Sequence, residues 1–107
     1  MKKRAFIYAQ VPLGMYRDQL NEFLDQMKKF CAENDLIIRL QRTEITYEWW
    51  EHRWEFKSAV NALEYNEIEY FIIVDREQIS NHELIFLKAK SEIEKHGTEL
   101  IILNELS

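Results

Sequence analysis

Few side chains in this sequence have the type and spacing that covalent or metal chemistry requires. The histidines His52, His82 and His96 lie far apart and lack the short spacings typical of metal ligands. The single cysteine, Cys31, falls on the apolar side of an expected helix, where a thiol behaves as a small hydrophobic group. We therefore expect no metal site, no cysteine nucleophile and no cofactor.

The glycines argue against the common phosphate-binding loops. Gly14 and Gly97 are the only two, and neither G-x-G-x-x-G nor G-x-x-x-x-G-K can be built from them. A response-regulator receiver would need acidic residues directly after the first strand, but Gln10-Val11-Pro12 supplies none, and Asp75 is then an isolated match. Nucleotide, flavin and phosphoacceptor sites are therefore not expected.

Aromatic residues gather in the middle of the sequence. Trp49, Trp50 and Trp54 fall within one short segment, and Tyr47 lies two residues before Trp49. Tryptophan is enriched at interface hot spots and is also highly buried in cores. Two interpretations stay open: these side chains cover the core, or they form a partner-binding patch.

Length and charge limit the classes of function. The chain has 107 residues, 14 Lys and Arg against 19 Asp and Glu, and a net charge of −5. One domain of this size is expected, and its acidic balance argues against stand-alone DNA binding, because the only basic run is Lys2-Lys3-Arg4. No apolar stretch is long enough to span a membrane, and no signal peptide is evident. A single cysteine fits a reducing compartment, and we expect a cytoplasmic protein.

Hydrophobic periodicity predicts seven regular elements. Runs rich in β-branched and aromatic residues predict strands at 5–11, 36–40, 70–74 and 100–103. Apolar residues at helical spacing predict helices at 17–34, 53–65 and 81–95. The polar and aromatic stretch 41–51 has no clear period and is interpreted as a loop, with an extension of the preceding strand left open. Gly97 is expected to end the last helix in a left-handed conformation.

The alternation of strands and helices predicts an α/β fold. Right-handed crossovers of this kind produce a mostly parallel four-stranded sheet with helices on both faces. The continuous apolar run 70–74 is typical of a central strand that is covered on both faces.

Several segments, taken in order, resemble the N-terminal catalytic domain of serine recombinases, the resolvase/invertase family. Tyr8-Ala9-Gln10-Val11-Pro12 is similar to the opening Tyr-Ala-Arg-Val-Ser of that family. The segment 52–56 is similar to its Asp-Arg-Pro-Gly-Leu, and 78–81 to its Arg-Leu-Ser-Arg. The resemblance continues through 94–105 without a gap after Arg53, and it implies the strand order 2-1-3-4.

The resemblance implies an active site that this sequence does not complete. A serine in the family attacks a DNA phosphodiester, and arginines stabilise the charge that develops on the phosphoryl oxygens. Pro12 occupies the position of that serine, and Gln10 occupies the position of an arginine. Arg53 is the one matching arginine that is kept.

The family also has an Asp-Arg pair before its third helix, followed by a further arginine. The ungapped comparison places Glu77 and Gln78 at the pair and Asn81 at the next arginine. A shift of two residues would instead place Asp75 and Arg76 at the pair. Either alignment leaves Pro12 without a nucleophilic oxygen.

The resemblance therefore implies a catalytically inactive, stand-alone domain that acts through protein contacts. The expected partner is a recombinase, a repressor or another protein of a mobile element or prophage, and a homo-oligomer stays open. We expect residues 1–107 to form this domain alone, without the dimerisation helix or the DNA-binding domain of the family. One alternative is a DNA-binding or recombination component whose missing contacts come from another chain. Another is a small-molecule-binding α/β domain.

Overall fold

The computed structural model describes residues 2–12, 17–46 and 54–106. Its strands are β1 (Lys3–Pro12), β2 (Leu36–Thr46), β3 (Tyr70–Ile73) and β4 (Glu99–Ile102). Its α-helices are α1 (Arg17–Glu33), α2 (Trp54–Ala62) and α3 (Glu83–Lys95). Two 3-10 helices, η1 (Arg76–Gln78) and η2 (Leu103–Glu105), follow β3 and β4.

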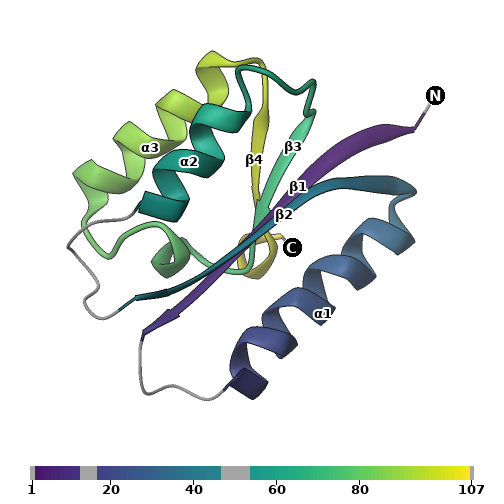
Figure 1. Ribbon diagram of the computed structural model, residues 1–107, viewed down its shortest axis with the longest axis horizontal. Coiled ribbons are helices and arrows are strands. Elements are labelled where there is room, and N and C mark those ends of the chain that lie inside the picture. Colours follow the sequence, from purple (N-terminus) through teal and green to yellow (C-terminus); the bar gives the residue numbers. More distant parts are fainter. Residues whose placement is uncertain (1, 13–16, 47–53, 107) are drawn as a thin grey trace.

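The four strands form one parallel sheet in the order β2-β1-β3-β4, which confirms the predicted α/β fold and strand order. Helix α1 covers one face of the sheet, and α2 and α3 cover the other (Figure 1). None of the described helices is long and apolar enough to cross a lipid bilayer.

Strand β1 lies at the centre and is buried on both faces. Phe6 and Tyr8 point toward α2 and α3, where they join an aromatic cluster with Phe56 and Phe71. The alternate side chains, including Ala5 and Ile7, face α1. Because side chains alternate along a strand, this one segment contributes to both hydrophobic cores. The predicted central strand 70–74 is likewise confirmed, with its residues 71–74 fully buried.

Strand β2 is longer than the sequence indicates. The strand extension that the sequence left open is present over 41–46, where a loop was the main expectation, and it continues alongside β1 as far as the pair Pro12 and Thr46. These residues are mostly polar, so they show no hydrophobic period, yet the long neighbouring strand satisfies their backbone hydrogen bonds. Residues 47–51 of the predicted loop lie outside the described ranges.

The predicted helices are confirmed with shifted ends. Helix α2 stops at Ala62, before the predicted end at residue 65, and α3 begins at Glu83, after the Ser80 hydroxyl accepts the His82 N–H at 3.0 Å. Gly97 has φ of +80°, as expected of a left-handed helix cap. Cys31 is buried on the inner side of α1, and burial raises the pKa of its thiol, which disfavours the reactive thiolate.

Candidate functional site

Four of the predicted site residues, Gln10, Pro12, Glu77 and Gln78, lie at the carboxyl end of the parallel strands, the edge where open α/β sheets most often bind ligands. Strand β1 extends to Pro12 there, whereas β3 pairs with β1 only over Ala5–Ile7. The chain turns after β3 into η1 and so occupies the space beside the last residues of β1. This difference in strand length decides which groups complete the hydrogen bonding of β1.

Gln10 and Gln78, two positions that the resemblance assigns to arginines, are brought into contact. The Gln10 backbone N–H donates to Gln78 Oε1 at 2.6 Å. In return, Gln10 Nε2 donates to the Glu77 carbonyl oxygen over a longer 3.5 Å. Both glutamines are buried, with exposed fractions of 1% and 3%. The Gln78 carboxamide therefore serves as the acceptor that a longer β3 would have offered to β1.

Glu44 is a buried residue of this edge that the sequence analysis did not identify. Its Oε2 accepts a hydrogen bond from the Tyr8 hydroxyl at 3.2 Å and another from the Phe56 N–H at 3.1 Å. The second donor belongs to the first turn of α2, where a carboxylate is favoured by the helix dipole. Glu44 thus joins β1, β2 and α2. Its only sequence signal was its place in the polar stretch interpreted as a loop.

The side chains of the connection after β3 bind different partners. Asp75 Oδ1 accepts the Glu77 N–H at 2.9 Å and begins η1. Arg76 binds both carboxylate oxygens of Glu105, at 2.6 and 3.1 Å, and lies 4.5 Å over the Phe86 ring. The hydrogen bonds between Arg76 and Glu105 lower the pKa of the carboxyl and raise that of the guanidinium. Gln78, and not Arg76, is therefore the residue of this connection that contacts Gln10.

The remaining predicted residues are dispersed. Pro12 is the last residue of β1, and Asn81 is exposed in the connection before α3. Trp54 is the first residue of α2, and its side chain is not described. The predictions made for Arg53 and for Tyr47, Trp49 and Trp50 lie outside the described residues.

The buried groups of this edge can form hydrogen bonds, but the two amides cannot supply positive charge. A carboxamide is neutral at all ordinary pH values, whereas a guanidinium always offers charge and up to five donors to phosphate. Within residues 2–12, 17–46 and 54–106, no three His, Cys, Asp or Glu side chains gather closely enough to hold a metal ion.

Several solved structures of serine recombinases and of their catalytic domains have a similar fold. The N-terminal catalytic domain of TP901-1 integrase has a TM-score of 0.84 at 19% identity, over 96% of this chain and 78% of that one. A resolvase family site-specific recombinase from Streptococcus pneumoniae has a TM-score of 0.87 at 15% identity, over 97% and 74% of the two chains.

A third similar structure is the C-terminal catalytic domain of ISC1926 TnpA, an IS607-like serine recombinase. Its TM-score is 0.83 at 13% identity, over 97% of this chain and 71% of that one. No protein-family model matches the chain, and no curated protein matches it by sequence. The likeness is thus one of three-dimensional structure: this chain has the fold of a serine recombinase catalytic domain.

Proposed function

We propose that this domain is a catalytically inactive, resolvase-like module that acts through protein contacts. Its partner would be a recombinase, a repressor or another protein of a mobile element or prophage. The contact between Gln10 and Gln78 carries this proposal. At two positions that the resemblance assigns to phosphate-binding arginines, the side chains are neutral and buried, and they complete the backbone hydrogen bonding of β1.

The chemistry of the strand end supports the same proposal. Covalent capture of DNA in the serine recombinase mechanism needs a side-chain oxygen that attacks phosphorus. Proline carries no such oxygen, and Pro12 ends β1 where the resemblance places the nucleophile. Neutral amides at Gln10 and Gln78, in place of two arginines, would also remove part of the electrostatic stabilisation that phosphoryl transfer requires.

The alternative of a DNA-binding component is less well supported. It would use a basic surface to bind phosphates, made of Lys2, Lys3, Arg4, Arg39, Arg42 and Arg53. Lys2 already pairs with Asp35 at 3.1 Å. Arg4 pairs with Glu67 at 3.0 Å and with Glu69 at 2.8 Å. Phosphate binding at Lys2 or Arg4 would have to displace these carboxylates, and the net charge of −5 opposes phosphate binding further.

Helix α3 offers an apolar surface that suits protein contacts. Three of its apolar side chains are exposed: Leu84 at 81%, Ile85 at 54% and Leu87 at 46%. Only Phe86 and Ile93 of this helix are buried. They lie within the first five residues of α3 and follow the exposed Asn81 closely. Adjacent exposed apolar residues of this kind are typical of protein interaction sites.

A recombination assay tests both parts of the proposal. The purified domain is added to a purified serine recombinase from the same organism and a DNA substrate, and recombinant product is measured. We expect the domain alone to form no SDS-resistant DNA adduct, and we expect it to change the yield of the recombinase in a dose-dependent manner. An adduct would overturn the inactivity, and an unchanged yield would overturn the regulatory role.

Two sets of variants locate the interaction surface. Leu84→Ser combined with Leu87→Ser removes apolar surface from α3, and the triple change Trp49→Ala, Trp50→Ala and Trp54→Ala removes the tryptophans. We expect at least one set to abolish the effect on recombination. Leu106→Ser, at another exposed leucine, is the matched control and should retain it. An effect that survives both sets would exclude both surfaces.

A further inference from the structure

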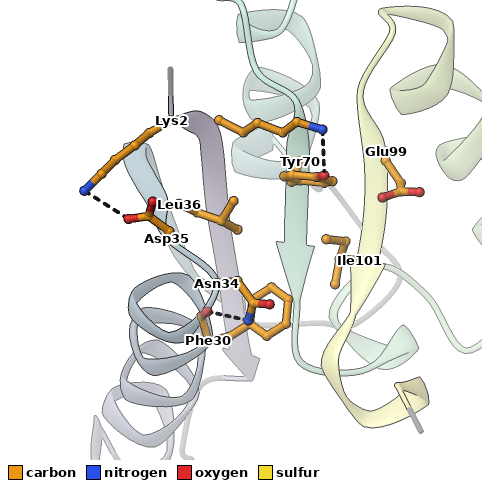
Figure 2. A pocket seen from close by; sticks show the side chains of 9 residues that line it. Lys2, Phe30, Asn34, Asp35, Leu36, Tyr70, Glu99 and Ile101 are labelled. Carbon is orange, nitrogen blue, oxygen red and sulfur yellow. Dashed lines mark hydrogen bonds and ion pairs between the residues drawn. The ribbon is translucent and has the colours of Figure 1, made fainter.

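A pocket lies at the opposite edge of the sheet, where the parallel strands begin. Its volume is about 560 Å³, and it opens on the face that α1 covers, beside the end of that helix. Figure 2 shows its side chains converging from α1, the turn after it and the strands. The lining residues that matter here are Lys3, Phe30, Leu36, Tyr70, Glu99 and Ile101.

The strand register places the polar members of this set on one face. Tyr70 pairs with Glu99, and Ile72 pairs with Ile101 two residues further along. Paired residues of parallel strands point to the same face, and residues two apart share it. Since Ile72 belongs to the core beneath α1, Tyr70 and Glu99 also face that side. Lys3, two residues before Ala5 of the same core, joins them.

Lys3 and Tyr70 together form a site for an anion. The Lys3 ammonium lies 3.3 Å from the Tyr70 hydroxyl oxygen and 5.5 Å from the centre of the ring. Because the hydroxyl accepts a hydrogen bond from Lys3, its own proton stays available for a second acceptor. In the described part of the chain, Lys3 forms no ion pair. A carboxylate could therefore accept from both groups.

Glu99 supplies the opposite charge on the other side of Tyr70. Its carboxylate has neither a hydrogen bond nor an ion pair among the described residues. Strands in a sheet lie about 4.8 Å apart and rise about 3.3 Å per residue. Glu99 is level with Tyr70 and Ala5, two residues along β1 from Lys3, so the backbones of Lys3 and Glu99 are about 12 Å apart across β3. Two long side chains of opposite charge thus lie on the same face, on either side of Tyr70, without a direct ion pair.

The rest of the lining is apolar or already neutralised. Phe30, Leu36 and Ile101 are half-buried and offer hydrophobic surface to the pocket. The nearby Lys2 and Asp35 neutralise each other at 3.1 Å. The pocket therefore combines one anion site, one cation site and an apolar surface, which is the usual composition of a small-ligand site.

We propose that this pocket binds a small zwitterion with an apolar body, of which a hydrophobic α-amino acid is the simplest example. The carboxylate of the ligand accepts from Lys3 and Tyr70, and its ammonium group donates to Glu99. The apolar body contacts Phe30 and Ile101. This inference is independent of the function proposed above, because it uses the opposite edge of the sheet.

Isothermal titration calorimetry of the full chain with L-phenylalanine tests the proposal. We expect a Kd of about 1 mM or tighter, with amide chemical-shift changes at Leu36 and Ile101. Phenylalaninamide lacks the carboxylate and N-acetylphenylalanine lacks the ammonium group. Each should bind about tenfold more weakly. Glycylphenylalanine carries the same charges further apart, so its relative affinity distinguishes a peptide ligand from a free amino acid.

Three variants assign the contacts to this pocket. Tyr70→Phe removes the hydroxyl and keeps the ring, and Glu99→Gln removes the charge. Each change should weaken the binding of L-phenylalanine about fivefold. Glu92→Gln changes an exposed glutamate on α3 and should have no effect. If about 10 mM L-phenylalanine produced neither a heat of binding nor amide chemical-shift changes, the proposal would be overturned. So would binding of both charge-deleted analogues as tightly as L-phenylalanine, or wild-type affinity in both pocket variants.

Discussion

Side chains complete the hydrogen bonding of β1 at both of its ends, but the acceptor is a neutral carboxamide at one end and an ionised carboxylate at the other. At the carboxyl end, the Gln10 N–H donates to the neutral Gln78 carboxamide at 2.6 Å. Near the amino end, the Arg4 N–H donates to the Glu69 carboxylate at the same distance of 2.6 Å. Both acceptors stand where the short β3 no longer reaches its longer neighbour.

The difference between the two ends lies in charge and in exposure. Gln78 is buried, whereas the Glu69 side chain is one third exposed and also binds the Arg4 guanidinium at 2.8 Å. The hydrogen bond from that guanidinium is the main reason that the pKa of Glu69 falls to about 2. At its carboxyl end, the hydrogen bonding of β1 is thus closed by a neutral, buried side chain, whereas at its amino end the acceptor is an ionised surface group with a pocket nearby.

Replacing Glu44 should produce the largest effect, because it is the buried carboxylate of the closed end. Glu44→Leu leaves the Tyr8 hydroxyl and the Phe56 N–H without their acceptor. We expect a loss of about 3 kcal/mol in the free energy of unfolding, measured by urea denaturation. Glu44→Gln keeps an acceptor oxygen and should lose less. Equal stability of Glu44→Leu and wild type would show that this end is not closed by hydrogen bonding.

Replacing Gln78 should have the next largest effect. Gln78→Leu keeps the volume of the side chain but leaves the buried Gln10 N–H without an acceptor. We expect a loss of about 2 kcal/mol, seen as a lower midpoint of thermal unfolding. The neighbouring Glu77 is exposed, so Glu77→Gln is the matched control and should stay within about 0.5 kcal/mol of wild type. A similar loss in both variants would contradict the assignment.

Replacing Glu69 should have the smallest effect, and one that depends on pH. The pKa of Glu69 is about 2 in the folded protein against an ordinary value of 4.5. A lowered carboxyl pKa stabilises the folded state above pH 4.5, and this stabilisation is lost as the pH falls from 4.5 toward 2. For Glu69→Gln we expect a loss of about 1 kcal/mol at pH 7, because solvent screens the one-third-exposed pair.

Urea denaturation at several pH values distinguishes the two ends of β1. The difference in stability between wild type and Glu69→Gln should shrink as the pH falls from 4.5 toward 2, because the Glu69 carboxyl of the unfolded wild-type chain binds a proton in this range while the folded carboxylate stays ionised. The difference for Gln78→Leu should stay constant, because a carboxamide does not titrate there. A constant difference for Glu69→Gln would contradict the ionised character of the amino end.

Much of the fold could be predicted from local patterns. The apolar run 70–74 indicated a central strand, and the structure buries 71–74 fully. Gly97 marked the end of α3 because its φ of +80° strains other residues. The polar residues 41–46 carry no such pattern, so the sequence could only leave open whether β2 continues through them. The exposed Leu84 and Leu87 also show that apolar residues at helical spacing need not all face the core.

The candidate site was predictable only as a set of positions. The resemblance singled out Gln10 and Gln78, but their contact joins residues 68 apart in the chain. Glu44 could not be identified, because its role depends on Tyr8 and Phe56, 36 and 12 residues away. The pocket around Tyr70 and Glu99 likewise depends on strand register, which the sequence leaves open.

The sequence by itself determined the alternation of strands and helices, because the period of the apolar residues reflects which face of a single strand or helix is buried. It also determined which groups are missing at Pro12 and Gln10. Only the tertiary structure decided that the Gln78 carboxamide completes the hydrogen bonding of β1 at its carboxyl end and that a pocket lies at the amino end of the sheet. The physical reason is the unequal length of β1 and β3, which leaves β1 to find hydrogen-bond acceptors on distant side chains.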